Sequence, residues 1–332
     1  MCKAVGLMSG GLDSMLAVRL LREQQVDVLG VCFITPFFSS VRAEAAARQL
    51  DVPLRVLDIS EEHLAMVKNP AHGYGKTMNP CIDCHALMFR RAGELMEAEG
   101  RDFLFSGEVL NERPMSQNRK ALAVVAETSG YPDHIVRPLS AKLLAETRPE
   151  REGLVDRSRL LDFHGRSRKP QMALARQWGI TDYPTPAGGC LLTEQQFSLR
   201  LGDLLDHEPD AGISEVEMLK VGRHFRLSPN VKMVCGRNRA ENDKLEALAR
   251  PQDTVLRPLG VPGPSAVLLG PPDPELLELA ASLLVRYSDT PPATASPGPD
   301  TVGRAHVTTP GGEHTLSARA ASQDLIDRLQ IK

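Results

Sequence analysis

Short apolar runs alternate with segments in which apolar residues recur every three or four positions through the first 140 residues. The runs lie at 4–8, 28–34, 54–59, 103–105 and 134–136, and the second pattern fills 15–21, 41–50, 61–68, 82–99 and 119–129. Runs of the first kind are typical of buried strands, and those of the second kind are typical of helices. Repeated alternation of the two predicts an α/β fold with a doubly wound parallel sheet.

The pattern changes twice along the rest of the chain. Residues 140–206 have a helical pattern broken by prolines, and they complete a first domain over 1–206. Short alternating segments at 218–221, 224–227 and 232–235, followed by helical patterns at 242–249 and 274–285, predict a smaller α+β domain over 214–289. Residues 290–300 are rich in Pro, Thr, Ser and Ala, which is typical of a linker. We expect 290–332 to be a linker and a weakly structured tail.

Composition sets broad limits on location and partners. The chain has 332 residues and a net charge of −3, so its overall charge gives no sign of a nucleic-acid partner. It has neither an export signal nor an apolar run of the roughly 18 residues that span a bilayer, which predicts a cytoplasmic protein without membrane contact. In that compartment its six cysteines are more typical of metal or catalytic sites than of disulfides. The sequence leaves a homodimer open.

A glycine-rich turn joins the first predicted strand to the first predicted helix. Its sequence is Ser9-Gly10-Gly11-Leu12-Asp13-Ser14. Such a turn presents free backbone N–H groups at a helix N-terminus, which suits a pyrophosphate group. A tight turn with a capping Asp or Ser is the alternative. Ligands gather at the carboxyl ends of parallel strands, so Gly107, after the run at 103–105, is expected to meet the same nucleotide.

Three cysteines stand in unusual local sequences. Cys81 and Cys84 are one turn apart at the start of a predicted helix, and Cys190 follows Gly188 and Gly189. Three thiols without an evident fourth ligand favour a [4Fe-4S] cluster with one open iron that binds sulfide. A thiol–disulfide or persulfide pair, and a zinc site or inert thiols, are the alternatives. The other cysteines are interpreted as buried or incidental thiols.

Together these motifs support a family resemblance. The SGGxDS turn, the segment Asn79-Pro80-Cys81-Ile82-Asp83-Cys84-His85 and the later Gly-Gly-Cys resemble the tRNA thiolation enzymes of the PP-loop ATP pyrophosphatase superfamily. The likeness covers about residues 1–205 and is strongest to the PP-loop half of the tRNA 4-thiouridine synthases, with the tRNA 2-thiouridylases as near relatives. Those synthases carry an RNA-binding region ahead of the loop, which here begins at residue 9. The basic segment after residue 214 is therefore expected to bind RNA.

The resemblance implies a function and a set of residues. The expected reaction is ATP-dependent thiolation of a tRNA uridine, 4-thiouridine more than 2-thiouridine, in which the uridine oxygen is adenylated and then displaced by sulfur from sulfide or a persulfide carrier. The expected contacts to ATP and Mg²⁺ are Ser9, Gly10, Gly11, Asp13, Ser14 and Gly107. The expected catalytic residues are Asp13, Cys81, Cys84 and Cys190, with the three cysteines as cluster ligands, and Lys76, Arg113 and Arg137 are candidate cations at the substrate. A PP-loop enzyme acting on a small molecule, or a non-catalytic nucleotide or iron–sulfur sensor, is the alternative.

Overall fold

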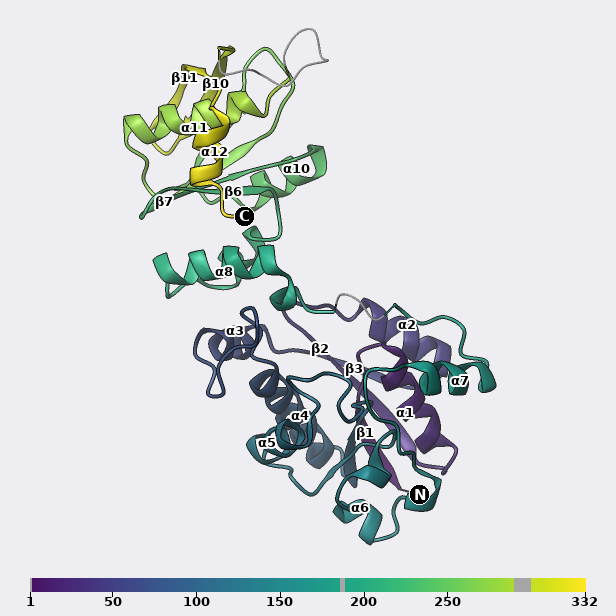
Figure 1. Ribbon diagram of the computed structural model, residues 1–332. Coiled ribbons are helices and arrows are strands. Elements are labelled where there is room, and N and C mark those ends of the chain that lie inside the picture. The colour runs from purple at the N-terminus through teal and green to yellow at the C-terminus, as the bar shows by residue number, and fades with distance from the viewer. Residues whose placement is uncertain (1, 186–188, 290–299) are drawn as a thin grey trace. The chain divides into compact units, whose positions relative to one another are not determined.

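The computed structural model describes residues 2–185, 189–289 and 300–332. The chain divides into two compact units, Met1–Thr193 and Glu194–Lys332, whose elements are labelled in Figure 1. Each unit has its own sheet and its own buried core. Within the described ranges, no helix has the length and apolar character needed to cross a membrane.

The first unit is built on a five-stranded parallel sheet with the order β3-β2-β1-β4-β5. Its strands are β1 (Lys3–Leu7), β2 (Asp27–Ile34), β3 (Leu54–Asp58), β4 (Phe103–Ser106) and β5 (Ile135–Val136). The chain builds outward from β1 through β2 to β3 and then crosses back to β4 on the other side of β1. This confirms the predicted doubly wound sheet and places its topological switch point between β1 and β4.

Helices cover both faces of this sheet (Figure 1). On one face lie α1 (Leu12–Arg22), α2 (Val41–Leu50) and α7 (Lys169–Gln177), which share a core with Ala4 and Val28. On the other face lie α4 (Cys81–Ala98) and α5 (Arg119–Ser129), which pack on Val5 and Val31. Neighbouring strand residues point to opposite faces, so buried β1 and β2 carry apolar residues at nearly every position. Helix α3 (Ser60–Lys68) precedes α4 and contacts it.

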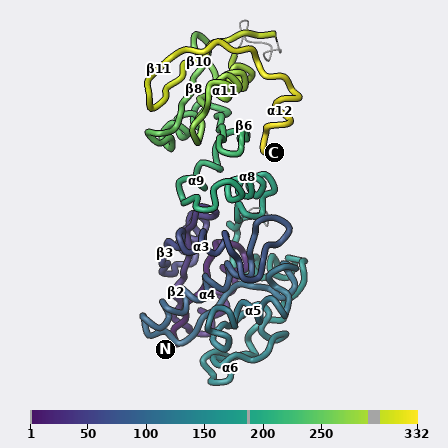
Figure 2. The backbone as a smooth tube through the Cα atoms, turned by 90° about the vertical axis from the view of Figure 1, so that its left-hand side faces the viewer, coloured from purple at the N-terminus to yellow at the C-terminus, as the bar shows by residue number. Residues whose placement is uncertain are grey.

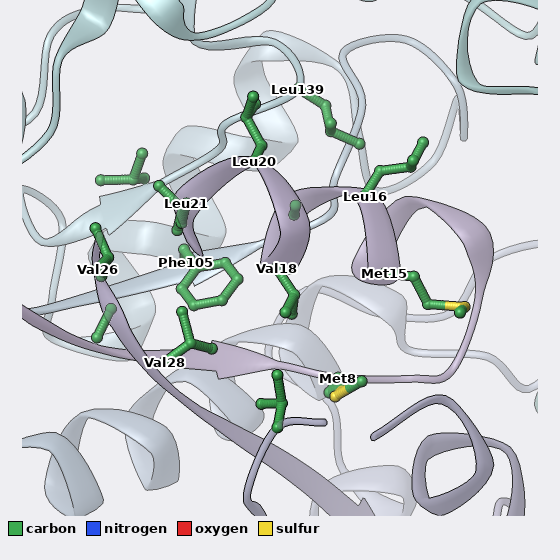
Figure 3. Packing of buried hydrophobic residues seen from close by; sticks show 14 of the residues in the cluster. Met8, Met15, Leu16, Val18, Leu20, Leu21, Val26, Val28, Phe105 and Leu139 are labelled. Carbon is green, nitrogen blue, oxygen red and sulfur yellow. The ribbon is translucent and has the colours of Figure 1, made fainter. Parts of the chain in front are cut away.

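A glycine on β1 lets a phenylalanine ring of β4 lie directly over the strand, on the face that α1 covers. Gly6 on β1 pairs with Phe105 on β4, and the Phe105 ring fills the space where a side chain of residue 6 would lie. Figure 3 shows this ring among Val18, Leu21 and Val28. A Cβ at position 6 would come within 2.2 Å of the ring, so α1 packs closely over β1 and β4 only with glycine there.

The part of the first unit that follows β5 is less helical than the sequence predicts. Residues 137–193 hold α6 (Arg148–Arg151), α7 and the short 3₁₀ turns Ala141–Leu143, Arg157–Arg159 and Leu191–Thr193. Prolines stand in the first turns of α6 and α7, where the missing N–H is tolerated, and they restrict the residues before them.

The second unit contains a six-stranded antiparallel sheet with the order β11-β10-β8-β9-β7-β6. The strands are β6 (Arg223–Ser228), β7 (Val231–Cys235), β8 (Thr254–Pro258), β9 (Ala266–Leu269), β10 (Val302–Thr309) and β11 (Gly312–Arg319). The helices are α8 (Gln195–His207), α9 (Ile213–Met218), α10 (Arg239–Leu248), α11 (Pro274–Arg286) and α12 (Gln323–Leu329). Helix α11 packs on one face and α10 on the other, which confirms the predicted α+β class.

Two sequence-based expectations need correction here. Residues 218–221 form the end of α9 and a turn rather than a strand, because four alternating residues do not distinguish the two, and Gly222 follows with a φ of +75°. The tail is not weakly structured, since β10 and β11 pair with each other and β10 pairs with β8 (Figure 2). Its alternation is faint because β11 is mostly exposed and β10 buries only Ala305 and Val307. All but the last residue of the linker predicted at 290–300 lie outside the described residues.

Helix α8 falls in the second unit, so the division comes before the boundary expected at residue 206. Asp203 on α8 accepts hydrogen bonds from Arg226 on β6 at 2.7 and 3.0 Å and from Lys232 on β7 at 3.0 Å. Lys232 is only 1% exposed, and its ammonium group forms an ion pair with Asp203. These pairs bind α8 to the antiparallel sheet, although helical periodicity alone does not show which unit a helix joins.

We expect Asp203→Ala to lower the free energy of unfolding of the second unit by about 3 kcal/mol, because it leaves a buried ammonium group without its counter-charge. Urea unfolding of the full chain measures this. Asp206→Ala, at an exposed position on the same helix, is the matched control and is expected to stay within about 0.5 kcal/mol of wild type. Equal effects of the two substitutions would contradict this account of α8.

Candidate nucleotide and sulfur site

The glycine-rich turn lies between β1 and α1, at the carboxyl end of the central strand. Gly11 is the N-cap of α1, and no side chain caps this helix end. The Ser9 hydroxyl accepts a hydrogen bond from the Gly11 N–H at 3.3 Å, and the Ser14 hydroxyl donates one to the Gly11 carbonyl at 2.8 Å. These bonds fix the turn while the first-turn amides of α1 stay uncapped by side chains. A helix end of this kind favours an anionic group.

Two glycines allow other backbone segments to touch this turn. A Cβ at Gly107, directly after β4, would lie 2.4–2.5 Å from the backbone of Asp13 and Ser14. A Cβ at Gly10, whose φ is +75°, would lie 2.3 Å from the backbone of Arg42 at the start of α2. Backbone atoms cannot yield as a side chain can, so both positions require glycine. The loops after β1 and β4 therefore meet at the switch point, as the sequence predicts.

Asp13 stands among charged and polar groups from three parts of the chain. Burial raises the pKa of Asp13, while the guanidinium groups of Arg168 and Arg113 and the amide of Gln171 act to lower it. Burial and the neighbouring Asp13 raise the pKa of Glu112 to about 7. The loop after β4 and the start of α7 thus converge on the first turn of α1. Two carboxyl groups with two guanidinium groups are suited to a metal–phosphate ligand.

Three chain segments bring the motif cysteines into one neighbourhood. Cys81 and Cys84 occupy the first turn of α4. The Thr77 hydroxyl donates to the Leu192 carbonyl at 2.7 Å, and the Leu191 N–H donates to the Phe37 carbonyl at 3.1 Å. These bonds hold the segment that begins at Cys190 against the loop that precedes α4. Gly188 lies outside the described residues, and a Cβ at Gly189 would meet no described atom within 4 Å, so the structure gives no close contact that requires glycine there.

Cys84 lies close to both of the other motif cysteines. Burial, followed by the nearby sulfurs of Cys190 and Cys81, raises its pKa well above the ordinary value. His63 on α3 lies with Nε2 3.2 Å from Cys84 Sγ, and its ring contacts the rings of both Phe37 and Phe38. Burial lowers the pKa of His63 to about 4, so its imidazole is neutral at pH 7. Cys84 therefore stays a thiol at neutral pH unless a bound cation or metal favours the thiolate.

A buried carboxylate links the nucleotide side of the site to the cysteine side. Glu108, directly after Gly107, accepts from His85 Nδ1 at 3.0 Å, from Arg137 Nε at 2.8 Å and from the Ser106 hydroxyl at 3.0 Å. Burial alone would raise the pKa of Glu108, but Arg137 and His85 outweigh it and lower this pKa to about 2. The ionised carboxylate requires a proton on His85 Nδ1, which fixes the tautomer of the neutral ring. The bond to Glu108 thus fixes the ring of His85, the residue that directly follows Cys84.

The three candidate cations have different surroundings. Arg113 is exposed and lies near Asp13 and Glu112, next to the glycine-rich turn. Lys76 is exposed on the loop before α4. Arg137 is buried and paired with Glu108, and its guanidinium also lies 5.9 Å from the centre of the Phe89 ring. The structure gives Arg137 a partner inside the protein, and the substrate roles of all three stay predictions.

The fold brings several further side chains to this place. Glu108 and Glu112 lie in the polar loop after the run at 103–105, which the sequence predicts to face the substrate, although it assigns neither carboxylate a role of its own. His63, Arg168 and Gln171 have no motif, and only the packing of α3 and α7 brings them near the site. His85, the last residue of the cysteine motif, binds Glu108 through its Nδ1. Among the described residues, no three His, Cys, Asp or Glu side chains are arranged to hold a metal ion.

Comparisons with known proteins give one family match within each of the two units. Residues 2–129 match the family model of the tRNA methyl transferase HUP domain, and residues 222–296 match that of the NFACT protein RNA binding domain. The tRNA-specific 2-thiouridylase MnmA of Desulfosudis oleivorans is 29% identical over 108 residues, 30% of this chain and 30% of that protein. MnmA of Rhodopseudomonas palustris is 28% identical over 202 residues, 54% and 46% of the two chains. The chain thus spans from about a third to a half of these relatives.

A solved 4-thiouridine synthetase–RNA complex with bound ATP is also similar to this chain, with 24% identity, a TM-score of 0.34, and coverage of 41% of this chain and 36% of that one. The fold and the family match define residues 2–129 as a HUP domain. This domain is of the PP-loop ATP pyrophosphatase type, which confirms the resemblance seen in the sequence. The C-terminal match covers β6 to α11 and agrees with the segment expected to bind RNA.

Glu108 predicts a specific dependence of stability on pH. Its pKa of about 2 in the folded chain lies below the model value of 4.5, so it stabilises the fold above pH 4.5, and this contribution is lost as the pH falls toward 2. The shift corresponds to about 3 kcal/mol. We expect Glu108→Gln to be about that much less stable at pH 7 and to approach wild type as the pH falls.

Urea unfolding at a series of pH values from 7 to 3 measures this difference. Glu127→Gln, at an exposed position on α5, is the control and should follow the wild-type curve throughout. A constant gap between Glu108→Gln and wild type at every pH would show that the carboxylate charge does not stabilise the network.

Proposed function

We propose that this chain is an ATP-dependent tRNA uridine thiolase that releases AMP and pyrophosphate. The observation that carries the proposal is that two adjacent residues after β4 contact two different motifs: Gly107 approaches the glycine-rich turn, and Glu108 binds His85 near the start of α4, next to Cys84. The first motif is suited to activating an oxygen with ATP, and the second to handling sulfur. The names of the relatives with the same HUP domain agree with this combination.

The nucleotide half of the reaction falls to the turn between β1 and α1. The uridine carbonyl oxygen attacks the α-phosphorus of ATP, and pyrophosphate leaves. The proposed contacts to the departing pyrophosphate are the amides of the turn, the hydroxyls of Ser9 and Ser14, and Mg²⁺ held near Asp13. Arg113 and Arg168 add positive charge on the side where negative charge develops. A uridine within folded tRNA must leave its stack to reach this place.

The sulfur half falls to Cys81, Cys84 and Cys190. Hydrosulfide attacks the activated carbon, AMP leaves with the former carbonyl oxygen, and one proton is released. In the kind and number of their ligand atoms, the three thiols fit a [4Fe-4S] cluster with an open iron. Such a cluster would supply bound sulfide as the nucleophile. A persulfide on one thiol is the alternative source of sulfur.

The relatives bear on the product and on RNA binding. The 2-thiouridylases among these relatives favour 2-thiouridine over the 4-thiouridine that the sequence motifs suggest, and we propose 2-thiouridine as the product. The RNA-binding match over 222–296 makes the second unit the proposed tRNA-binding part of the chain. Arg239 and Lys244 are exposed on α10 within this range and are candidate phosphate contacts.

The test of the whole proposal is turnover that depends on tRNA. Incubation of the full chain with unmodified tRNA, Mg²⁺, ATP and sulfide should form AMP and pyrophosphate, and nucleoside analysis should show 2-thiouridine. Asp13→Asn is expected to lower the rate at least a hundredfold, because the carboxylate near the phosphates loses its charge. Glu127→Gln, exposed on α5, is the control and should retain wild-type turnover. AMP formation without tRNA, or with a small molecule in its place, would contradict the proposal.

The sulfur centre is tested by anaerobic purification with iron and sulfide analysis. Each of Cys81→Ala, Cys84→Ala and Cys190→Ala is expected to abolish thiolation and to remove iron from the protein. Cys235→Ala, which removes a buried thiol from β7, is the control and should retain both. An iron-free wild type that accepts sulfur from a persulfide donor would refute the cluster and favour the persulfide. Full activity of Cys190→Ala would exclude the trio.

A further inference from the structure

The start of helix α7 places a buried amide next to Asp13. Gln171 lies in the first turn of α7 and is 1% exposed. One turn further along, Ala175 is fully buried in the core that α7 shares with α1. Residues four apart lie on the same helix face, so Gln171 occupies the face that packs on α1. A polar side chain stands where the pattern of the helix calls for an apolar one.

Several polar atoms at this place are buried without a partner. Asp13 Oδ1, Arg168 Nε and both amide atoms of Gln171 lack a hydrogen bond to any described residue. The Gln171 amide nevertheless lies close enough to Asp13 for a weak hydrogen-bonding interaction that lowers the pKa of this carboxyl, although the two groups are not within normal hydrogen-bond distance. A buried amide without hydrogen bonds costs stability, and few groups in a folded domain are left in this state. Orphaned atoms from two separate segments around one carboxyl group indicate a site whose hydrogen bonds form only with its ligand.

We propose that Gln171 is a positioning residue for Asp13, whose amide holds the Asp13 carboxyl in place when ATP with its metal ion enters the PP-loop. This rests on the proposed use of ATP and deepens it. The Gln171 N–H group donates to one Asp13 oxygen, which leaves the other oxygen directed at the ligand. The buried Arg168 Nε, from the residue before α7, is a further donor for the bound anion. Without ligand these groups make no hydrogen bond of normal length to a described residue, and the cost of burying them is offset on binding.

The proposal separates stability from affinity. Gln171→Met has nearly the same shape and removes two unpaired buried polar atoms, so Tm is expected to rise by about 2–5 °C. Affinity for Mg·ATP, measured by calorimetry on the full chain without tRNA, is expected to fall about tenfold, the worth of one charge-assisted hydrogen bond. If Gln171 had only a structural role, Gln171→Met would lower both the Tm and the affinity for Mg·ATP. Gln171→Asn, which keeps an amide one methylene short, is expected to give a smaller loss of affinity.

Two further variants decide whether Gln171 acts through Asp13. In an Asp13→Asn background, Gln171→Met should cause no additional loss of Mg·ATP affinity, since the cycle isolates the coupling between the two residues. Gln177→Met, at an exposed position of the same helix, is the matched control and should leave Tm and affinity unchanged. Wild-type affinity in Gln171→Met, a lowered Tm, or an equal effect in both backgrounds would overturn the proposal. A wild type that binds no Mg·ATP would instead refute the proposed function.

Discussion

The contact between the backbone after β4 and the first turn of α1 is the constraint on which the site depends. Gly107 approaches Asp13 and Ser14 so closely that any side chain would displace the turn. This approach is a consequence of the strand order, because β4 lies beside β1 only after the chain reverses its direction across the sheet. Two loops from distant parts of the sequence then share one edge. The helix end of α1 gains a second wall, and with it the charged groups of the loop at 108–113.

The same loop also reaches the cysteines. Glu108 follows Gly107 directly, so the residue that fixes His85 at the start of α4 is attached to the residue that fits the PP-loop. Its ionised carboxylate is buried, and it is stable there only because Arg137, His85 and Ser106 all donate to it. A displacement of one side of the site therefore acts on the other through two adjacent residues. This coupling suits a reaction in which an oxygen is activated first and sulfur arrives second.

The sequence predicts the elements with strong periodicity and the motifs with local spacing. The parallel sheet, the PP-loop turn and the CxxC pair at a helix start are all features of contiguous residues. What it does not predict depends on partners far away in the chain. Helix α8 joins the second unit through the ion pairs of Asp203, and β10 and β11 gain their order from pairing at a sheet edge. His63 and Gln171 stand in ordinary helical patterns, so no local signal distinguishes them from core or surface residues.

The polarity of the site sets stability against function. A chain selected for stability alone would place an apolar side chain at Gln171, because both amide atoms there are buried and unpaired within the described residues. The same holds for His63, whose Nδ1 is buried without a described partner while Nε2 faces Cys84. One of these side chains lies beside the nucleotide turn and the other beside the thiols. Since hydrogen bonds missing from the protein alone are the ones a ligand can supply, the two positions mark where binding energy is expected to enter the fold.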